Sequence, residues 1–364
     1  MDAPLPATHV ELFAVQPRVS LEDYASPASF AARHRALAAR VDALRARDEA
    51  GRPLYPALAV WPEMVGAALG LMGHLPRVRR CRTTNAAMTR MALAEWLALW
   101  RTWRRLRPPT MEECLYVAVA PRVHRAMWET FSGIARDFGL WVVAGSALLP
   151  ANRLGPDTPE FEPDGARTYN TSYTFSSEGR CVAVTRKVNL VPTQEDVLHL
   201  SPGRPEDLPV LQTPFGRLGT LVCYDGFREP HTAKEPYFVP CAQYLDALGV
   251  DVIAQPSANA WPWDAPWAFN DTAAGESQLR REQWFNEGLY TQLRTLTRVR
   301  YAVNPQLVGG FLDNTFEAPS LILERTGPGE VRVLAQSATP RDEDVLHVTV
   351  PLPERVGAQA RTGG

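Results

Sequence analysis

Cys223 is the side chain in this sequence best placed to act as a nucleophile. It follows the short apolar run Leu218–Val222, which contains β-favouring residues and is bounded by Gly216 and Gly226. Such a run predicts a buried strand that ends abruptly, and a cysteine at its end would be held at the edge of a sheet, as the nucleophiles of α/β hydrolases are. The alternative is that Cys223 is one more small buried hydrophobic residue, because free cysteine is among the most buried residue types.

Two charged residues occupy similar positions elsewhere in the chain. Glu63 follows the predicted strand Tyr55–Trp61, and Lys187 ends the predicted strand Cys181–Lys187. Lys187 lies 124 residues after Glu63, and Cys223 lies 36 residues after Lys187. Only a sheet that places strand ends side by side could therefore bring the three together. Taken singly, a strand-end glutamate is usually a solvated loop residue, and a lysine in such a place usually lies on the surface.

The elements that must position these residues alternate between strand and helix in the first half of the chain and form hairpins later. This pattern favours one α/β domain with a mixed sheet or two packed sheets. The remaining predicted strands are Val10–Val15, Leu115–Ala120, Leu140–Ala147, Tyr169–Phe175, Val250–Gln255, Val299–Val303, Pro319–Leu323, Val331–Leu334 and Leu346–Val350. The predicted helices are Ser29–Arg47, Ala86–Leu106, Val123–Phe138, Tyr237–Leu248 and Gly275–Thr297.

Composition excludes several classes of function. The chain has 364 residues, a formal charge of -2 and both signs of charge mixed along it, so no global field points to nucleic acid or an acidic membrane. Its five cysteines have no CxxC spacing, and its seven histidines form no HxH or HExxH pair, so neither a disulfide scaffold nor a metal site is predicted. Residues 1–10 lack the pattern of a secretory signal, and the longest apolar stretch, Met91–Trp100, is interrupted by Glu95. We expect a soluble, reduced, cytoplasmic protein.

The predicted helix Ala86–Leu106 combines tryptophans with arginines near its end. A basic amphipathic helix could contact a membrane or nucleic acid. The composition favours an ordinary packed helix, or one that faces a second subunit.

Taken together in chain order, Glu63, Lys187 and Cys223 resemble the catalytic glutamate, lysine and cysteine of the nitrilase superfamily of carbon–nitrogen hydrolases. The resemblance runs from Val10 to about Pro351 and includes Asp137-Phe138-Gly139, Tyr169-Asn170-Thr171 and Pro256-Ser257-Ala258-Asn259. It implies a single α/β domain over residues 1–352, a four-layer-forming α-β-β-α sandwich of the nitrilase type, and a homodimer or larger homo-oligomer. Residues 66–112 are then an added lid or oligomer contact, and residues 353–364 a flexible tail.

The resemblance also implies the chemical roles. Glu63 would be the general base, Lys187 and the backbone N–H of Tyr224 would stabilise developing negative charge, and Cys223 would form a thioester. The family's second glutamate corresponds to Glu195 or to Asp196, and the longer side chain favours Glu195. No cofactor is implied.

The same resemblance implies a substrate class. Asn259, Trp261 and Trp263 would line the pocket, although the tryptophans could equally pack against the protein itself or another subunit. The stretch Cys223-Tyr224-Asp225 resembles amidases and favours a small amide or N-carbamoyl substrate, whereas Lys-x-x-Leu-Val-Pro-Thr, from residue 187, also resembles nitrilases. Phe227 stands where many amidase-like members carry arginine, which leaves the substrate open. The expected partner is a small molecule, with no nucleic acid and no membrane. A non-catalytic scaffold that binds through the tryptophan- and arginine-rich segment is the rival from another class.

Overall fold

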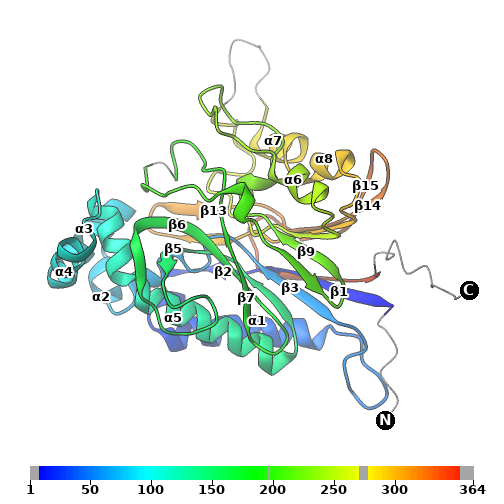
Figure 1. Cartoon of the computed structure of the whole chain (residues 1–364), viewed down its shortest axis with the longest axis horizontal. Coiled ribbons are helices and arrows are strands. Elements are labelled where there is room, and N and C mark those ends of the chain that lie inside the picture. The colour runs from blue at the N-terminus through cyan, green and yellow to red at the C-terminus, as the bar shows by residue number, and fades with distance from the viewer. Residues whose placement is uncertain (1–7, 196, 270–277, 353–364) are drawn as a thin grey trace, which may run out of the picture.

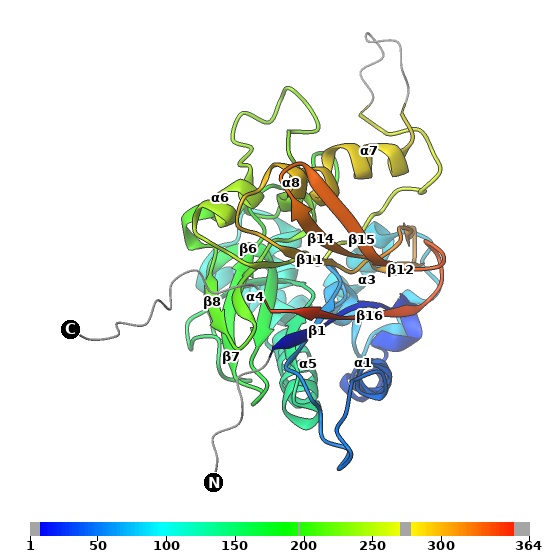
Figure 2. The ribbon, with the colours of Figure 1, turned by 90° about the vertical axis from the view of Figure 1, so that its right-hand side faces the viewer.

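The computed structural model describes residues 8–195, 197–269 and 278–352 and contains two stacked β-sheets covered by helices on both outer faces (Figure 1). The helices are α1 (Pro27–Ala43), α2 (Leu75–Val78), α3 (Thr84–Ala94), α4 (Trp96–Leu106), α5 (Met111–Phe138), α6 (Cys241–Ala247), α7 (Arg280–Glu287) and α8 (Leu289–Thr295). Short 3-10 turns are η1 (Leu21–Tyr24), η2 (Ala67–Leu71), η3 (Pro205–Asp207) and η4 (Cys223–Gly226). Helices α1 and α5 cover the first sheet, and α6 and α8 cover the second (Figures 1 and 2).

The first sheet has seven strands in the order β16-β1-β3-β4-β6-β5, with β7 paired to β6. Its strands are β16 (Asp344–Pro351), β1 (His9–Gln16), β3 (Ala57–Trp61), β4 (Trp141–Ala144), β6 (Pro163–Phe175), β5 (Ala147–Asn152) and β7 (Cys181–Arg186). The second sheet has the order β15-β14-β11-β10-β9-β8. Its strands are β15 (Glu330–Gln336), β14 (Leu321–Gly327), β11 (Tyr301–Asn304), β10 (Val252–Ala254), β9 (Gly216–Thr220) and β8 (Val210–Thr213). A small third sheet joins β13 (Asn314–Phe316), β12 (Val308–Phe311) and β2 (Arg18–Val19).

The apolar alternation along the strands explains why the sheets stack. On β1, Val10 and Leu12 belong to the apolar layer between the two sheets, together with Phe215 and Val252 of the second sheet or its flanking turn. Phe13, the residue after Leu12, packs instead with the helices outside the first sheet. Because successive strand side chains point to opposite faces, a strand that is apolar on both faces must be covered on both. The expected α-β-β-α sandwich is confirmed.

Strand directions bring the predicted reactive residues to one rim. β3 runs parallel to β4, β6 runs antiparallel to β4, and β7 runs antiparallel to β6. The strands β3 and β7 therefore end at the same edge, where Glu63 and Lys187 follow them. In the second sheet β9 and β10 are parallel, and Cys223 follows β9.

The predicted strand Leu115–Ala120 is wrong, because that segment lies within the long helix α5, which continues through Pro121. Thr110 caps the start of α5, with its side chain accepting from the backbone N–H of Glu113. A short apolar run with β-branched residues cannot be told from one turn of a buried helix by periodicity. Most of this run is buried, and α5 as a whole packs against β5 and β6.

Two predicted helices are each divided in the structure. The helix predicted over Ala86–Leu106 breaks at Glu95, which ends α3 and begins α4. The Glu95 carboxylate contacts Nε2 of His74 at 2.8 Å and also pairs with Arg122, so the residue at the break is held by two side chains distant in sequence. The segment predicted as Gly275–Thr297 divides at Gly288 into α7 and α8.

Some predicted features lie outside the described residues. These are Asp196, the start of the helix predicted from Gly275, and the tail 353–364. Within the described ranges, no helix has both the length and the apolar character needed to cross a membrane.

Candidate active site

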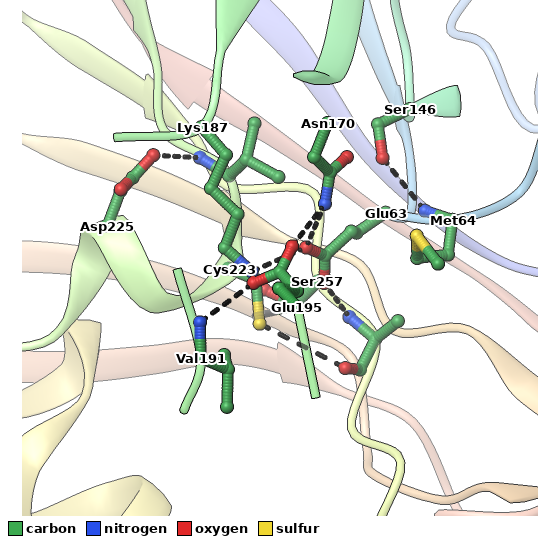
Figure 3. Close-up of polar contacts among 12 residues, drawn as sticks. Glu63, Met64, Ser146, Asn170, Lys187, Val191, Glu195, Cys223, Asp225 and Ser257 are labelled. Carbon is green, nitrogen blue, oxygen red and sulfur yellow. Dashed lines mark hydrogen bonds and ion pairs between the residues drawn. The ribbon is translucent and has the colours of Figure 1, made fainter. Parts of the chain in front are cut away.

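Glu63 lies just beyond β3 in a turn held by the connection between β4 and β5 (Figure 3). Gly145 in that connection has φ +66, and a Cβ there would lie 2.1 Å from the carbonyl oxygen of Pro62. Only glycine fits such a close approach in the left-handed region. The next residue, Ser146, accepts a hydrogen bond from the backbone N–H of Met64 at 2.9 Å. The turn directs Glu63 into the interior, where its side chain is buried.

Lys187 joins two buried carboxylates. Its Nζ lies 2.8 Å from Oε1 of Glu63 and 2.5 Å from Oε2 of Glu195. Asn170 on β6 donates through Nδ2 to the same two residues, at 2.8 Å to Glu63 and 2.9 Å to Glu195. The backbone N–H of Val191 also donates to Glu195, at 2.9 Å. One ammonium and one amide thus hold together two carboxylates that would otherwise repel each other.

Cys223 begins η4 with a strained backbone at φ +49. Its backbone N–H donates to the carbonyl of Pro256 at 2.8 Å, and its carbonyl accepts from Nε2 of Gln255 at 2.7 Å. The Sγ lies 4.0 Å from the carbonyl oxygen of Ala258. The N–H of the same Ala258 donates to Oε2 of Glu63 at 3.0 Å. A positive φ at a residue other than glycine costs of order 1–3 kcal/mol and persists where the surroundings over-determine it, which is common at active sites.

Asp225 connects the turn of the cysteine to the segment that carries the lysine. Its carboxylate accepts from the backbone N–H groups of Val188 and Asn189, at 3.1 and 2.7 Å, and from that of Val222 at 3.3 Å. Burial raises the pKa of Asp225 to about 7, against the opposing effect of these donors and of the Lys187 charge. The turn after β9 and the segment after β7 are therefore joined by one buried carboxyl group.

Burial shifts the pKa values of both groups that would exchange the thiol proton: the raised pKa of Glu63 favours the transfer, and the raised pKa of Cys223 opposes it. Burial raises the pKa of Glu63, and the charge of Glu195 raises it further, while Lys187 and a hydrogen bond with the Cys223 thiol oppose the rise. Burial and the neighbouring Glu63 charge also raise the pKa of Cys223, so the free thiol stays protonated. Burial alone would lower the pKa of Lys187, but the two carboxylates hold it well above its usual value. The site thus holds a protonated thiol, an unusually basic carboxylate and a fixed positive charge.

No metal site accompanies this arrangement in the described part of the chain, where no group of three or more His, Cys, Asp or Glu side chains could hold an ion.

Known proteins that are similar to this chain include carbon–nitrogen hydrolases. The family model described as carbon-nitrogen hydrolase matches residues 96–229, a segment that includes Lys187 and Cys223. The chain is therefore similar to carbon–nitrogen hydrolases over about a third of its length. Pantetheinase from Sus scrofa is 37% identical to it over 102 residues, which are 28% of this chain and 19% of that protein. Omega-amidase NIT2 from Danio rerio is 30% identical over 104 residues, 27% of this chain and 32% of that protein. The matches therefore span less than a third of either relative's length.

Solved structures of a bacterial amidase share the carbon–nitrogen hydrolase fold. A mutant of the Nesterenkonia AN1 amidase from the nitrilase superfamily has a TM-score of 0.53 and 18% sequence identity, covering 95% of this chain and 92% of that one. A second mutant of this amidase, described as showing Michael addition of acrylamide at the active site cysteine, has a TM-score of 0.52 and 19% identity, covering 95% and 93%.

The structure brings Glu63, Lys187, Cys223 and Glu195 into one buried cluster (Figure 3). Their catalytic roles stay predictions, and Asp196 lies outside the described residues. The side chain of Tyr224 is directed elsewhere, with its hydroxyl donating to Glu235 at 2.8 Å. The role predicted for its backbone N–H stays a prediction.

The three predicted pocket residues have different surroundings. Asn259 is fully buried and braces its own loop, because Nδ2 donates to the carbonyls of Trp261 and Glu317 and Oδ1 accepts from Arg280. Trp263 belongs to the apolar cluster that includes Cys223. Trp261 is half-buried, with Arg280 5.0 Å from its ring centroid. Their role as substrate-lining residues stays a prediction.

Arg280 on α7 and Asn170 on β6 are site features that the sequence did not reveal. Arg280 is buried with its guanidinium within 5.8 Å of four ring centroids, those of Phe227, Trp261, Trp267 and Trp284. Burial lowers its pKa to about 9. Nothing in its local sequence signals this position. Asn170 belongs to the motif Tyr169-Asn170-Thr171, but only the fold shows that its amide donates to the carboxylates of Glu63 and Glu195.

Proposed function

We propose that the protein is a cysteine-dependent hydrolase that cleaves the non-peptide carbon–nitrogen bond of a small amide or N-carbamoyl compound and releases ammonia. The observation that carries the proposal is the meeting of Glu63, Lys187 and Cys223 from three strand ends. Ala258 links Glu63 to Cys223, because its backbone N–H donates to the Glu63 carboxylate and its carbonyl oxygen lies 4.0 Å from Sγ of Cys223.

In the first half-reaction, Glu63 accepts the thiol proton as Sγ of Cys223 attacks the carbonyl carbon of the amide. The oxygen of the tetrahedral intermediate becomes negative, and Lys187 stabilises that charge. When the intermediate collapses, the carbon–nitrogen bond breaks and Glu63 returns the proton to the departing nitrogen. Ammonia leaves, and the acyl group remains on Cys223 as a thioester.

In the second half-reaction, Glu63 takes a proton from water as the water oxygen attacks the thioester carbon. Collapse of the second tetrahedral intermediate breaks the carbon–sulfur bond, and the proton returns to the sulfur. The products over both halves are one carboxylic acid and one ammonia from one amide and one water. Glu195 and Asn170 keep Lys187 and Glu63 in place throughout.

Several observations favour amides over nitriles. The family relatives named above are a pantetheinase and an omega-amidase, and the similar solved structures are those of an amidase. The motif Cys223-Tyr224-Asp225 resembles the same branch.

Ammonia release from matched panels of amides, N-carbamoyl amino acids and nitriles tests the proposal. We expect turnover of at least one amide or N-carbamoyl compound, and loss of that turnover in Cys223→Ala with the fold preserved. Cys241→Ala, at another buried cysteine, is the matched control and should retain activity. Turnover of nitriles alone would favour a nitrilase, and activity that survives Cys223→Ala would contradict the proposed nucleophile.

A further inference from the structure

Helix α4 lies at the left edge of the molecule in Figure 1, and it and its neighbouring segments carry large apolar side chains that are exposed to solvent. We call Leu93, Trp96, Trp100, Trp103 and Met111 the α4 face. Their exposed fractions are 72%, 65%, 49%, 47% and 59%. They line a groove of about 700 Å³. The sequence favoured a packed helix here, or one that faces a second subunit, and within α4 only Leu99 is buried. An exposed apolar patch of this kind marks an interaction site.

The segment that carries this face is strongly basic. Residues 64–111 contain nine arginines and one acidic residue, Glu95, although the whole protein has a formal charge of -2. All nine arginines are exposed. Glu95 is already bound by His74 and Arg122. Among the described residues, only Arg105 of the nine has a carboxylate within 4.0 Å, that of Glu162. Eight exposed arginines therefore lack a carboxylate partner there: Arg77, Arg79, Arg80, Arg82, Arg90, Arg101, Arg104 and Arg107.

The positive charge and the aromatic surface share one face. The guanidinium carbon of Arg104 lies 4.9 Å from the ring centroid of Trp100, and that of Arg107 lies 4.1 Å from Trp103. These are cation–π distances. Any partner that covers the tryptophans therefore also meets the arginines.

We propose that the α4 face docks on the surface of a lipid bilayer that contains anionic lipids. Arginines would meet the headgroup phosphates, tryptophans would lie at the interface, and Leu93 and Met111 would reach the acyl boundary. A second copy is disfavoured, because a two-fold interface sets the same patch against itself and brings unpaired arginines together. A nucleic acid would match arginine and tryptophan but leaves the exposed aliphatic side chains without a function.

Co-sedimentation of the full-length protein with vesicles tests this proposal. The probes are vesicles of phosphatidylcholine alone and vesicles with about a quarter phosphatidylglycerol, at low salt and again at high salt. We expect pelleting with the anionic vesicles that high salt reduces. Arg101→Glu/Arg104→Glu should weaken partitioning by about tenfold or more, because it replaces attraction to the anionic surface with repulsion. Trp100→Ser/Trp103→Ser should weaken it by about tenfold or more as well, because it removes apolar area that would be buried at the interface.

Matched controls separate this surface from general charge and exposure. Arg18→Glu/Arg52→Glu makes the same change of net charge at exposed arginines elsewhere, and Tyr237→Ser removes a ring that is 92% exposed. Both should pellet like the wild type, and all variants should keep their circular dichroism spectrum. Absence of pelleting with anionic vesicles at low salt would overturn the proposal. So would equal pelleting of all variants, a dimer that the tryptophan substitutions dissociate without vesicle binding by the wild type, or binding to a single-stranded oligonucleotide but not to vesicles.

Discussion

At the scale of single residues, the site depends on how one carboxylate is kept basic inside the protein. Glu63 is buried beside a second carboxylate, Glu195, and the two are tolerated because Lys187 and Asn170 contact both. The raised pKa of Glu63 makes it a better acceptor for a thiol proton than an exposed glutamate would be. Asn170 is therefore a positioning residue whose donors also limit how far that pKa rises.

Replacing Asn170 with alanine should lower kcat by on the order of tenfold, equal to about 1.4 kcal/mol. A donor to a carboxylate stabilises its charged form, so its loss should raise the pKa of Glu63 further. Because Glu63 must be ionised to accept the thiol proton, activity is lost as the pH falls through that pKa. The acidic limb of the kcat/KM profile should therefore move to higher pH in Asn170→Ala.

The matched control is Asn152→Ala, which removes an amide whose partners are backbone carbonyl and N–H groups of its own loop. It should leave the pH profile in place. A fall in activity of Asn170→Ala without any shift of the acidic limb would mean that the amide acts on something other than the carboxylate's proton affinity.

At the scale of elements, the site is built by turns that follow strands. Gly145 lets the connection between β4 and β5 press against the turn after β3, and Asp225 ties the turn after β9 to the segment after β7. These contacts place side chains that come from both sheets.

Gly145→Ala should destabilise the protein and misplace Glu63. Its φ of +66 is unfavourable for alanine by roughly 1–2 kcal/mol. The added Cβ would also lie 2.1 Å from the carbonyl oxygen of Pro62, so the turn must move. Gly155→Ala is the control, since that glycine also has positive φ (+87) but a Cβ there meets nothing within 4 Å. Chemical denaturation should show a larger loss for Gly145→Ala, accompanied by a loss of activity. Equal losses for the two variants would mean that the close approach to Pro62 has no role.

The elements also show what the sequence could reveal. Position after a strand marks Glu63, Lys187 and Cys223 as candidates because strand ends meet at a sheet edge, but their predicted roles come from the family resemblance of the three together. The region of residues 115–120 was misjudged because its β-branched run satisfies a strand and a buried helix equally well. The break at Glu95 could not be predicted, because it depends on Arg122, which is distant in sequence.

At the scale of the whole molecule, two sheets must stack before any site exists. The sandwich could be predicted from family resemblance and from apolar runs, but the contacts across it could not. Asn170 faces Glu63 across 107 residues of chain, and Arg280 reaches the aromatic cluster around Phe227 from α7. The exposure of the α4 face is likewise a tertiary property. An amphipathic helix has an apolar side by sequence, and only the fold shows whether another element covers it.

The relative labelling rate of the five cysteines is the most direct test of whether Glu63, Lys187 and Cys223 meet in one reactive site. If exposure alone set the labelling rate, Cys81 would be labelled first, because it is half-buried while the other four cysteines are buried. If Glu63 removes the thiol proton inside the assembled site, limiting iodoacetamide or acrylamide should modify Cys223 first, as peptide mass spectrometry would show. Glu63→Gln, which cannot accept that proton, should lose this preference by roughly a hundredfold or more. Modification of Cys81 ahead of Cys223, or a preference for Cys223 that survives Glu63→Gln, would contradict the account.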